Sequence, residues 1–163
     1  MNQPEPTQAI RNQIASMRMV YYAMAAPIII FPAIAYFLIE TGALGPPDYS
    51  LAPLLQTIAI ILVPLCIGAG YFFFKTSASR IDSKLPLSER LRRYFAALMV
   101  RSAIFEGGFI FCFVATILTG EILFLAVAPV LLFIFLLLRP NTESIATDLN
   151  LSPSERSQID SYQ

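Results

Sequence analysis

The chain has 163 residues, of which 56% are hydrophobic and only 13% are charged. Soluble domains carry about a quarter charged residues and disordered chains lack apolar ones, so the composition excludes both classes. Eleven Lys and Arg residues balance eleven Asp and Glu residues, and the basic excess of a nucleic-acid-binding protein is missing. The composition therefore predicts an integral membrane protein whose main partner is the lipid bilayer.

The first predicted element is a transmembrane helix near the N-terminus. Residues 1–18 are mostly polar and are expected to form a cytoplasmic tail, and a run of 21 uncharged residues follows over 19–39. About 20 helical residues cross the ~30 Å hydrocarbon core of a bilayer, so a first span is predicted over residues 19–40. The run is too long for the apolar region of a secretory signal, and we expect it to remain in the mature protein.

A second span and the start of a third helix follow. A run of 24 uncharged residues predicts the second span over residues 51–74. Pro86 and Ser88 then predict a helix start, with Ser88 as the N-cap. No residue breaks the helical pattern between Ser88 and Gly107, so the third helix, over residues 88–118, is expected to begin well outside the membrane.

The first turns of this third helix carry an apolar face at three- and four-residue spacing, with basic residues elsewhere around the helix. The apolar residues are Leu91, Tyr94, Phe95 and Leu98, and the basic ones are Arg90, Arg92 and Arg93. One interpretation is a basic amphipathic surface that lies against anionic lipid headgroups. The simpler interpretation, which we favour, is an ordinary cytoplasmic extension of the third helix.

A tight turn is predicted at Thr119 and Gly120. Residues 98–138 are apolar except for a few charged positions, and one helix of that length would be about twice as long as the bilayer is thick. The turn makes the fourth helix, over residues 121–139, an antiparallel neighbour of the third. The sequence thus predicts an all-α, polytopic membrane protein with four transmembrane helices, within residues 19–140, in an up-down bundle.

Residues 141–163 are polar and are expected to form a second cytoplasmic tail. Ser152, Pro153 and Glu155 have the pattern of a capping box, with proline at the first helical position. A short helix is therefore predicted from Pro153 onward. At this length it needs to dock on another part of the chain to be stable.

The distribution of lysine and arginine predicts that both termini and the connection between the second and third helices are cytoplasmic. Basic residues gather in the cytoplasmic segments of membrane proteins. Residues 42–50 and 119–121 contain none. The basic residues elsewhere are Arg11, Arg18, Lys75, Arg80, Lys84, Arg90, Arg92, Arg93, Arg139 and Arg156, and Arg101 extends this group into the third span.

Glu106 is the one acidic residue predicted deep in the bilayer. Counted from Leu98 at ~1.5 Å per residue, it lies about 12 Å below the cytoplasmic edge, a depth at which an ionisable side chain marks a candidate functional site. The charged form of a carboxyl is disfavoured away from water, so we expect Glu106 to be protonated at neutral pH. The candidate intramembrane polar site consists of Glu106, Ser102 on the same helical face, Arg101, Gly107 and Gly108.

The first role that we consider for Glu106 is structural. Arg101 is a poor counter-ion, because a separation of five residues places the two side chains about 140° apart around the helix. Pro32 has no amide hydrogen, so it leaves the Ile28 carbonyl without its helical partner. A hydrogen bond from a protonated Glu106 to that carbonyl would join the first and third spans.

The alternative role is a proton or cation site. Gly107 and Gly108 directly follow Glu106 and leave room for a neighbouring helix or a water molecule. The segment 105–109 is similar to the ion-binding glutamate segment of rotary-ATPase proteolipids, which implies ion translocation. The chain departs from that family, because it has only seven glycines and lacks glycine-repeat helices.

The residue types of common active sites are scarce. The chain has no histidine, and Cys66 and Cys112 are predicted at different heights in the bilayer, so we expect no metal, haem or disulfide site. No nucleophile–base pair, glycine-rich phosphate loop or paired-carboxylate motif is present. We therefore expect a non-enzymatic integral membrane protein without a cofactor, an accessory or scaffold subunit whose partners are other membrane subunits or a second copy of itself. The alternative is a small proton- or cation-coupled transporter or channel that uses Glu106.

Several short segments of the second half of the chain carry a family resemblance. They are Arg101, residues 105–108 (Phe-Glu-Gly-Gly), residues 118–120 (Leu-Thr-Gly), Arg139 with Pro140, and residues 148–151 (Asp-Leu-Asn-Leu). Over about residues 90–155 the chain resembles small four-helix bacterial inner-membrane proteins. The resemblance implies a multi-pass protein of the bacterial cytoplasmic membrane, and it adds no activity and no catalytic residue.

Overall fold

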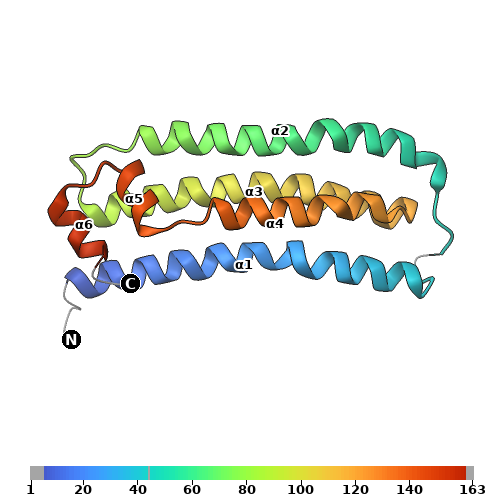
Figure 1. The fold of residues 1–163 in the computed structure, drawn as a ribbon, viewed down its shortest axis with the longest axis horizontal. Helices are drawn as coiled ribbons and strands as arrows, with labels where there is room; N and C mark the ends of the chain where they lie inside the picture. Colours follow the sequence, from blue (N-terminus) through green and yellow to red (C-terminus); the bar gives the residue numbers. More distant parts are fainter. Residues whose placement is uncertain (1–5, 44, 161–163) are drawn as a thin grey trace.

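The computed structural model describes residues 6–43 and 45–160, and every regular element in this part of the chain is a helix (Figure 1). This confirms the predicted all-α class. The long helices are α1 (Pro6–Glu40), α2 (Ala52–Ser79) and α3 (Leu87–Thr119). A 3₁₀ turn, η1 (Tyr49–Leu51), precedes α2, and a second one, η2 (Ile122–Ala126), runs directly into α4 (Val127–Leu137). Two short helices, α5 (Thr142–Asp148) and α6 (Pro153–Asp160), follow.

The four longest helices, α1 to α4, lie side by side, and the chain reverses direction at each connection between them (Figure 1). The central helix is α3, which packs against α1, α2 and α4, while α1 also packs against α4. A polar contact joins α1 to α4, because the Tyr21 hydroxyl donates to the Phe135 carbonyl at 2.7 Å. The start of α1, residues 80–86, α5 and α6 share one end of the molecule, which we call the α5–α6 end.

The described helices have the dimensions and surfaces of membrane spans. Three of them, within residues 12–40, 49–79 and 87–119, are long and apolar enough to cross a membrane. A fourth span is added if η2 and α4 are counted with α5, from which they are separated by a bend of 73°. Large apolar side chains face outward, such as Ile60 and Phe72, each 73% exposed. An outward apolar surface of this extent fits a chain surrounded by lipid and suggests a multi-pass membrane protein.

Two helices are longer than the sequence predicts. The first begins at Pro6 instead of residue 19, and the second continues to Ser79 instead of ending at residue 74. A charged residue ends an apolar run but does not end a helix. The prediction placed the helix ends at the ends of the apolar runs, and the helices continue beyond them. The added turns of α1 are not a loose tail, because Ile10, Ile14 and Met17 are buried at three- and four-residue spacing.

The start of α3 also differs from the prediction. The N-cap is Pro86 and the helix begins at Leu87, so the prediction of Ser88 as N-cap is wrong. Instead, the Ser88 carbonyl accepts a hydrogen bond from Gln13 Nε2 on α1 at 3.0 Å. The apolar face of this region is not available to lipid headgroups, since Leu91 and Leu98 are buried against other helices.

The turn after α3 is formed as predicted. Gly120 ends the helix with a φ of +69°, a left-handed conformation that glycine adopts without strain, and its amide donates to the Thr116 carbonyl at 2.8 Å. The fourth helix then begins as a 3₁₀ turn, and α-helical geometry starts only at Val127. Pro129 explains this start, because it has no amide to donate and the first turn of a helix needs none.

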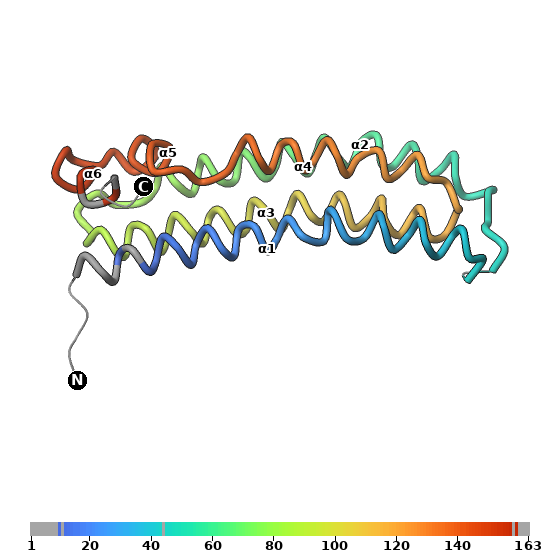
Figure 2. The backbone as a smooth tube through the Cα atoms, turned by 60° about the horizontal axis from the view of Figure 1, so that its bottom comes forward, coloured from blue at the N-terminus to red at the C-terminus, as the bar shows by residue number. Residues whose placement is uncertain are grey.

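The C-terminal segment, which contains α5 and α6, folds back against one end of the long helices (Figure 2). The predicted capping box of α6 is present: the Ser152 amide donates to Glu155 Oε2 at 2.8 Å, and the Glu155 amide donates to Ser152 Oγ at 3.4 Å. The sequence did not predict α5, which has its own capping box formed by Asn141 and Ser144. Ile145 and Ile159 are almost completely buried, so the segment is docked on the long helices.

Candidate functional site

Arg101 is a buried cation at the junction of three helices. It lies on α3 and is 3% exposed. Its Nη2 donates to the Leu138 carbonyl at 2.8 Å, and its guanidinium carbon lies 4.5 Å from the centre of the Phe74 ring on α2. Leu138 caps the C-terminus of α4, where helix carbonyls lack an internal partner. Arg101 thus supplies a donor to the end of α4 and a cation to the negative end of its dipole.

The charge of Arg101 is not balanced by a carboxylate. Among the described residues, no ion pair includes Arg101, and its Nε is buried without a hydrogen-bond partner. The Phe74 ring and one carbonyl offer only partial compensation. A buried charge without a counter-ion costs several kcal/mol, so an anion beside Arg101 would offset part of that cost.

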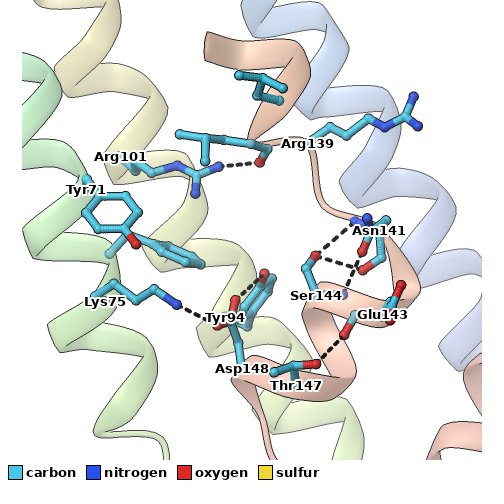
Figure 3. A pocket seen from close by; sticks show the side chains of 13 residues that line it. Tyr71, Lys75, Tyr94, Arg101, Arg139, Asn141, Glu143, Ser144, Thr147 and Asp148 are labelled. Carbon is cyan, nitrogen blue, oxygen red and sulfur yellow. Dashed lines mark hydrogen bonds and ion pairs between the residues drawn. The ribbon is translucent and has the colours of Figure 1, made fainter.

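A polar cavity lies beside Arg101 at the α5–α6 end, and we call it the α5 cavity (Figure 3). Its volume is about 450 Å³, within the usual range of small-molecule sites. Figure 3 shows the Arg101 guanidinium pointing into it from one side and Tyr94 and Asp148 facing it from the other. The lining residues come from α2 (Tyr71, Phe74, Lys75), α3 (Tyr94, Arg101), the end of α4 (Leu137, Leu138, Arg139) and the α5 region (Asn141, Glu143, Ser144, Thr147, Asp148).

The other two cations of the cavity, Lys75 and Arg139, have different surroundings from Arg101. Lys75 Nζ lies 3.0 Å from Asp148 Oδ1, and the Tyr94 hydroxyl donates to Asp148 Oδ2 at 3.2 Å. These contacts hold α5 against α2 and α3 and neutralise Lys75. Arg139 is exposed, and in Figure 3 its side chain extends away from the cavity. Arg101 therefore remains the cation that an anion in the cavity would meet.

A second buried arginine fixes the C-terminal segment. Arg90 is 2% exposed; it donates to the Leu149 carbonyl and pairs with Glu155 Oε1 at 2.9 Å. The pKa of the Glu155 carboxyl is lowered chiefly by the Ser152 backbone amide, with help from the Ser152 hydroxyl and Arg90, against an opposing effect of burial. These contacts hold the end of α5 and the start of α6 against the first turn of α3.

The structure places the residues of the predicted intramembrane site in different surroundings. Arg101 faces the α5 cavity, which Glu106 does not line. Ser102 is buried. Gly108 faces α2, where an added Cβ would lie 3.4 Å from Cys66 Cβ, whereas Gly107 faces open space. The five residues therefore do not form one cluster.

Glu106 does not make the expected hydrogen bond to the Ile28 carbonyl. Its Oε1 is buried and has no partner in the described part of the chain, and no hydrogen bond joins it to α1. Instead, α1 meets this region of α3 through aromatic rings: the Phe31 ring is tilted by 34° against the Phe113 ring, and their centroids are 4.9 Å apart. The prediction matched the depths of Glu106 and Ile28, and depth alone does not bring two groups within hydrogen-bonding distance.

Sequence reasoning missed the cavity residues outside α3. Lys75 and Asp148 are 73 positions apart, and nothing in either local sequence signals their pairing. A usable signal did exist for α5, since Asn141 followed at the third position by Ser144 is a capping pattern.

Cys66 and Cys112 are both free thiols, and the described residues hold no group of three or more potential metal ligands. Comparison of the chain with protein-family models, curated proteins and solved structures gives no match.

Proposed function

We propose that the chain is a non-enzymatic multi-pass protein of the bacterial cytoplasmic membrane, with four spans in an up-down bundle and both termini cytoplasmic. The distribution of basic residues supports this orientation. Lys75, Arg80, Arg90 and Arg139 belong to the segments that meet at the α5–α6 end, whereas residues 42–50 and 119–121 at the other end contain no Lys or Arg. In this orientation the α5 cavity lies at the cytoplasmic membrane interface.

We further propose that the protein binds a phosphate-bearing anion in the α5 cavity, as an accessory or scaffold subunit of a membrane complex. The observation that carries this proposal is the Arg101 guanidinium, which is 3% exposed, has no carboxylate partner among the described residues and borders a cavity of about 450 Å³. The planar fork of arginine matches two oxygens of a phosphate, and such charge-assisted bonds are the strong ones.

Thermal unfolding of the full chain in a non-ionic detergent tests this proposal. Two probes are added separately, inorganic phosphate and dioleoyl phosphatidylglycerol, because a ligand that binds only the folded state raises the unfolding midpoint. We expect at least one probe to raise the midpoint of the wild type and of the control Arg80→Met, and neither to raise that of Arg101→Met. Arg101→Lys keeps the charge but loses the fork, so it should need about tenfold more probe. An equal rise in Arg101→Met, or none in the wild type, contradicts the proposal.

The second candidate function, a proton- or cation-coupled transporter or channel, has one specific observation in its favour. Glu106 Oε1 is buried without a partner, and ionisable residues in that condition within membranes are often functional. Proton flux into vesicles that contain the purified chain tests it. If the protein is a transporter, the wild type shows proton flux and Glu106→Gln abolishes it. If Glu106→Gln behaves like the wild type and Glu106→Leu is destabilised, Glu106 has a packing role.

A further inference from the structure

The α5 cavity and a second cavity are both lined by α2 and α4, and we call the path between the two cavities the groove. Both α2 and α4 pack against α3, but they have little contact with each other. The lining of the α5 cavity includes Tyr71 and Phe74 of α2 and Leu137 and Leu138 at the end of α4. The polar cavity therefore also has apolar side chains in its lining, with which a free phosphate ion makes no favourable contact.

A second cavity lies farther along the same groove, and we call it the apolar cavity. Its volume is about 320 Å³. It is lined from α2 by Gln56, Ala59, Ile60, Val63 and Pro64, and from η2 and α4 by Leu123, Phe124 and Val127. Gln56 is the only polar residue in this lining. Two hollows of opposite character thus lie between the same pair of helices.

The spacing of the two cavities matches one leaflet of a bilayer. Leu137 lines the α5 cavity and Val127 lines the apolar cavity, and ten residues of helix separate them by about 15 Å. On α2, the two linings are separated by about 10 Å at their near edges, Pro64 and Tyr71, and by about 28 Å at their far edges, Gln56 and Lys75, a range that includes this distance. Half of the ~30 Å hydrocarbon core is also about 15 Å, which is the depth that one acyl chain covers.

Resting on the proposed anion-binding function, we propose that the α5 cavity and the apolar cavity form a single site for one membrane phospholipid, with its phosphate at Arg101 and an acyl chain along the groove between α2 and α4. The phosphate supplies the counter-charge that Arg101 lacks among the described residues. The acyl chain of the lipid covers apolar side chains of the groove, and because lipid already surrounds the helices, this contact positions the bound lipid without driving its binding.

Native mass spectrometry of the full chain in detergent tests the phospholipid site. The probes are dioleoyl phosphatidylglycerol, dioleoylglycerol, which has the same chains without the phosphate, and glycerol 3-phosphate, which has the phosphate without chains. We expect one bound phosphatidylglycerol per chain, little binding of dioleoylglycerol, and no displacement by excess glycerol 3-phosphate. Arg101→Met should lower the affinity about tenfold or more, because it removes charged hydrogen bonds.

Two variants of neighbouring residues test the groove. Ile60 lines the apolar cavity and Ile61 does not, and both are largely exposed, at 73% and 64%. Ile60→Trp should fill the cavity and weaken phosphatidylglycerol binding about tenfold, while the matched control Ile61→Trp should bind like the wild type. Circular dichroism and the unfolding midpoint establish that each variant is folded. If Arg101→Met does not fold, Arg101→Lys is used in its place.

The outcomes separate this inference from the function on which it rests. If Arg101→Met weakens binding, Ile60→Trp does not, and glycerol 3-phosphate displaces the lipid, the site binds a soluble phosphate; the phospholipid assignment is then wrong and the anion-binding function stands. If the Arg101→Met variant folds and binds phosphatidylglycerol and glycerol 3-phosphate as the wild type does, the phospholipid assignment and the anion-binding function are both wrong.

Discussion

The α5–α6 end and the middle of α3 are held together by different kinds of interaction. The ion pairs among the described residues lie toward the α5–α6 end, and two of them, Lys75 with Asp148 and Arg90 with Glu155, join segments far apart in sequence. In the middle of the molecule, α2 approaches α3 at two glycines: Gly70 lies against Phe105 and Gly108 against Cys66. Charge selects the partners at one end, and close contact of small residues selects them in the middle.

The largest expected effect comes from filling a glycine contact. A Cβ at Gly70 would lie 2.7 Å from Phe105 Cε1 and 3.2 Å from the Arg101 carbonyl, so Gly70→Leu forces α2 away from α3. We expect the free energy of unfolding to fall by about 3 kcal/mol, measured by denaturant titration in detergent. Gly68→Leu is the matched control, because nothing lies within 4 Å of a Cβ there. Equal stability of the two variants would show that close contact at Gly70 does not hold α2 on α3.

The next effect is expected from Arg90. Arg90→Met leaves the Leu149 carbonyl and the Glu155 carboxylate without their donor. We expect the free energy of docking of α5 and α6 to fall by about 2 kcal/mol, which is less than for a fully buried pair because Glu155 is 27% exposed. Hydrogen exchange of the α6 amides measures this. Arg92→Met removes an ion pair whose arginine is 74% exposed and should change α6 exchange little. Unchanged α6 exchange in Arg90→Met would contradict a docking role for this arginine.

The sequence predicted those features that depend on local composition. Helix class and the apolar spans follow from uncharged length, and the turn at Gly120 follows from a single residue that tolerates positive φ. Helix ends were less predictable, because the polar turns at Ile10 and Ile14 are held by packing against other segments. In the candidate site, Arg101 was identified from its place in the sequence, but its partner at the end of α4, 37 positions away, was not predicted.

A smaller effect is expected at the cap of α5. The Asn141 side chain accepts from the Ser144 amide at 2.6 Å, and Asn141→Ala removes this bond from the helix that lines the α5 cavity. We expect a loss of about 1 kcal/mol in the local stability of α5, seen as faster exchange of its amides, while α1 and α2 stay protected. Thr147→Val, which removes an exposed hydroxyl from the same helix, is the control. If both variants exchange alike, the cap does not stabilise α5.

The smallest effect is a pH dependence of docking at Glu155. The pKa of this carboxyl is lower in the folded chain than its ordinary value of about 4.3, chiefly through the Ser152 amide. A lowered pKa means that its contribution is fully present above the unfolded value and is lost as the pH falls through the folded value. Exchange of the α6 amides, corrected for the intrinsic effect of pH, should therefore accelerate between about pH 5 and pH 3. Glu155→Gln should remove most of that acceleration, because its side chain does not titrate. If Glu155→Gln retained the full pH dependence, other carboxylates of this end, such as Asp148 beside Lys75, would have to control the docking.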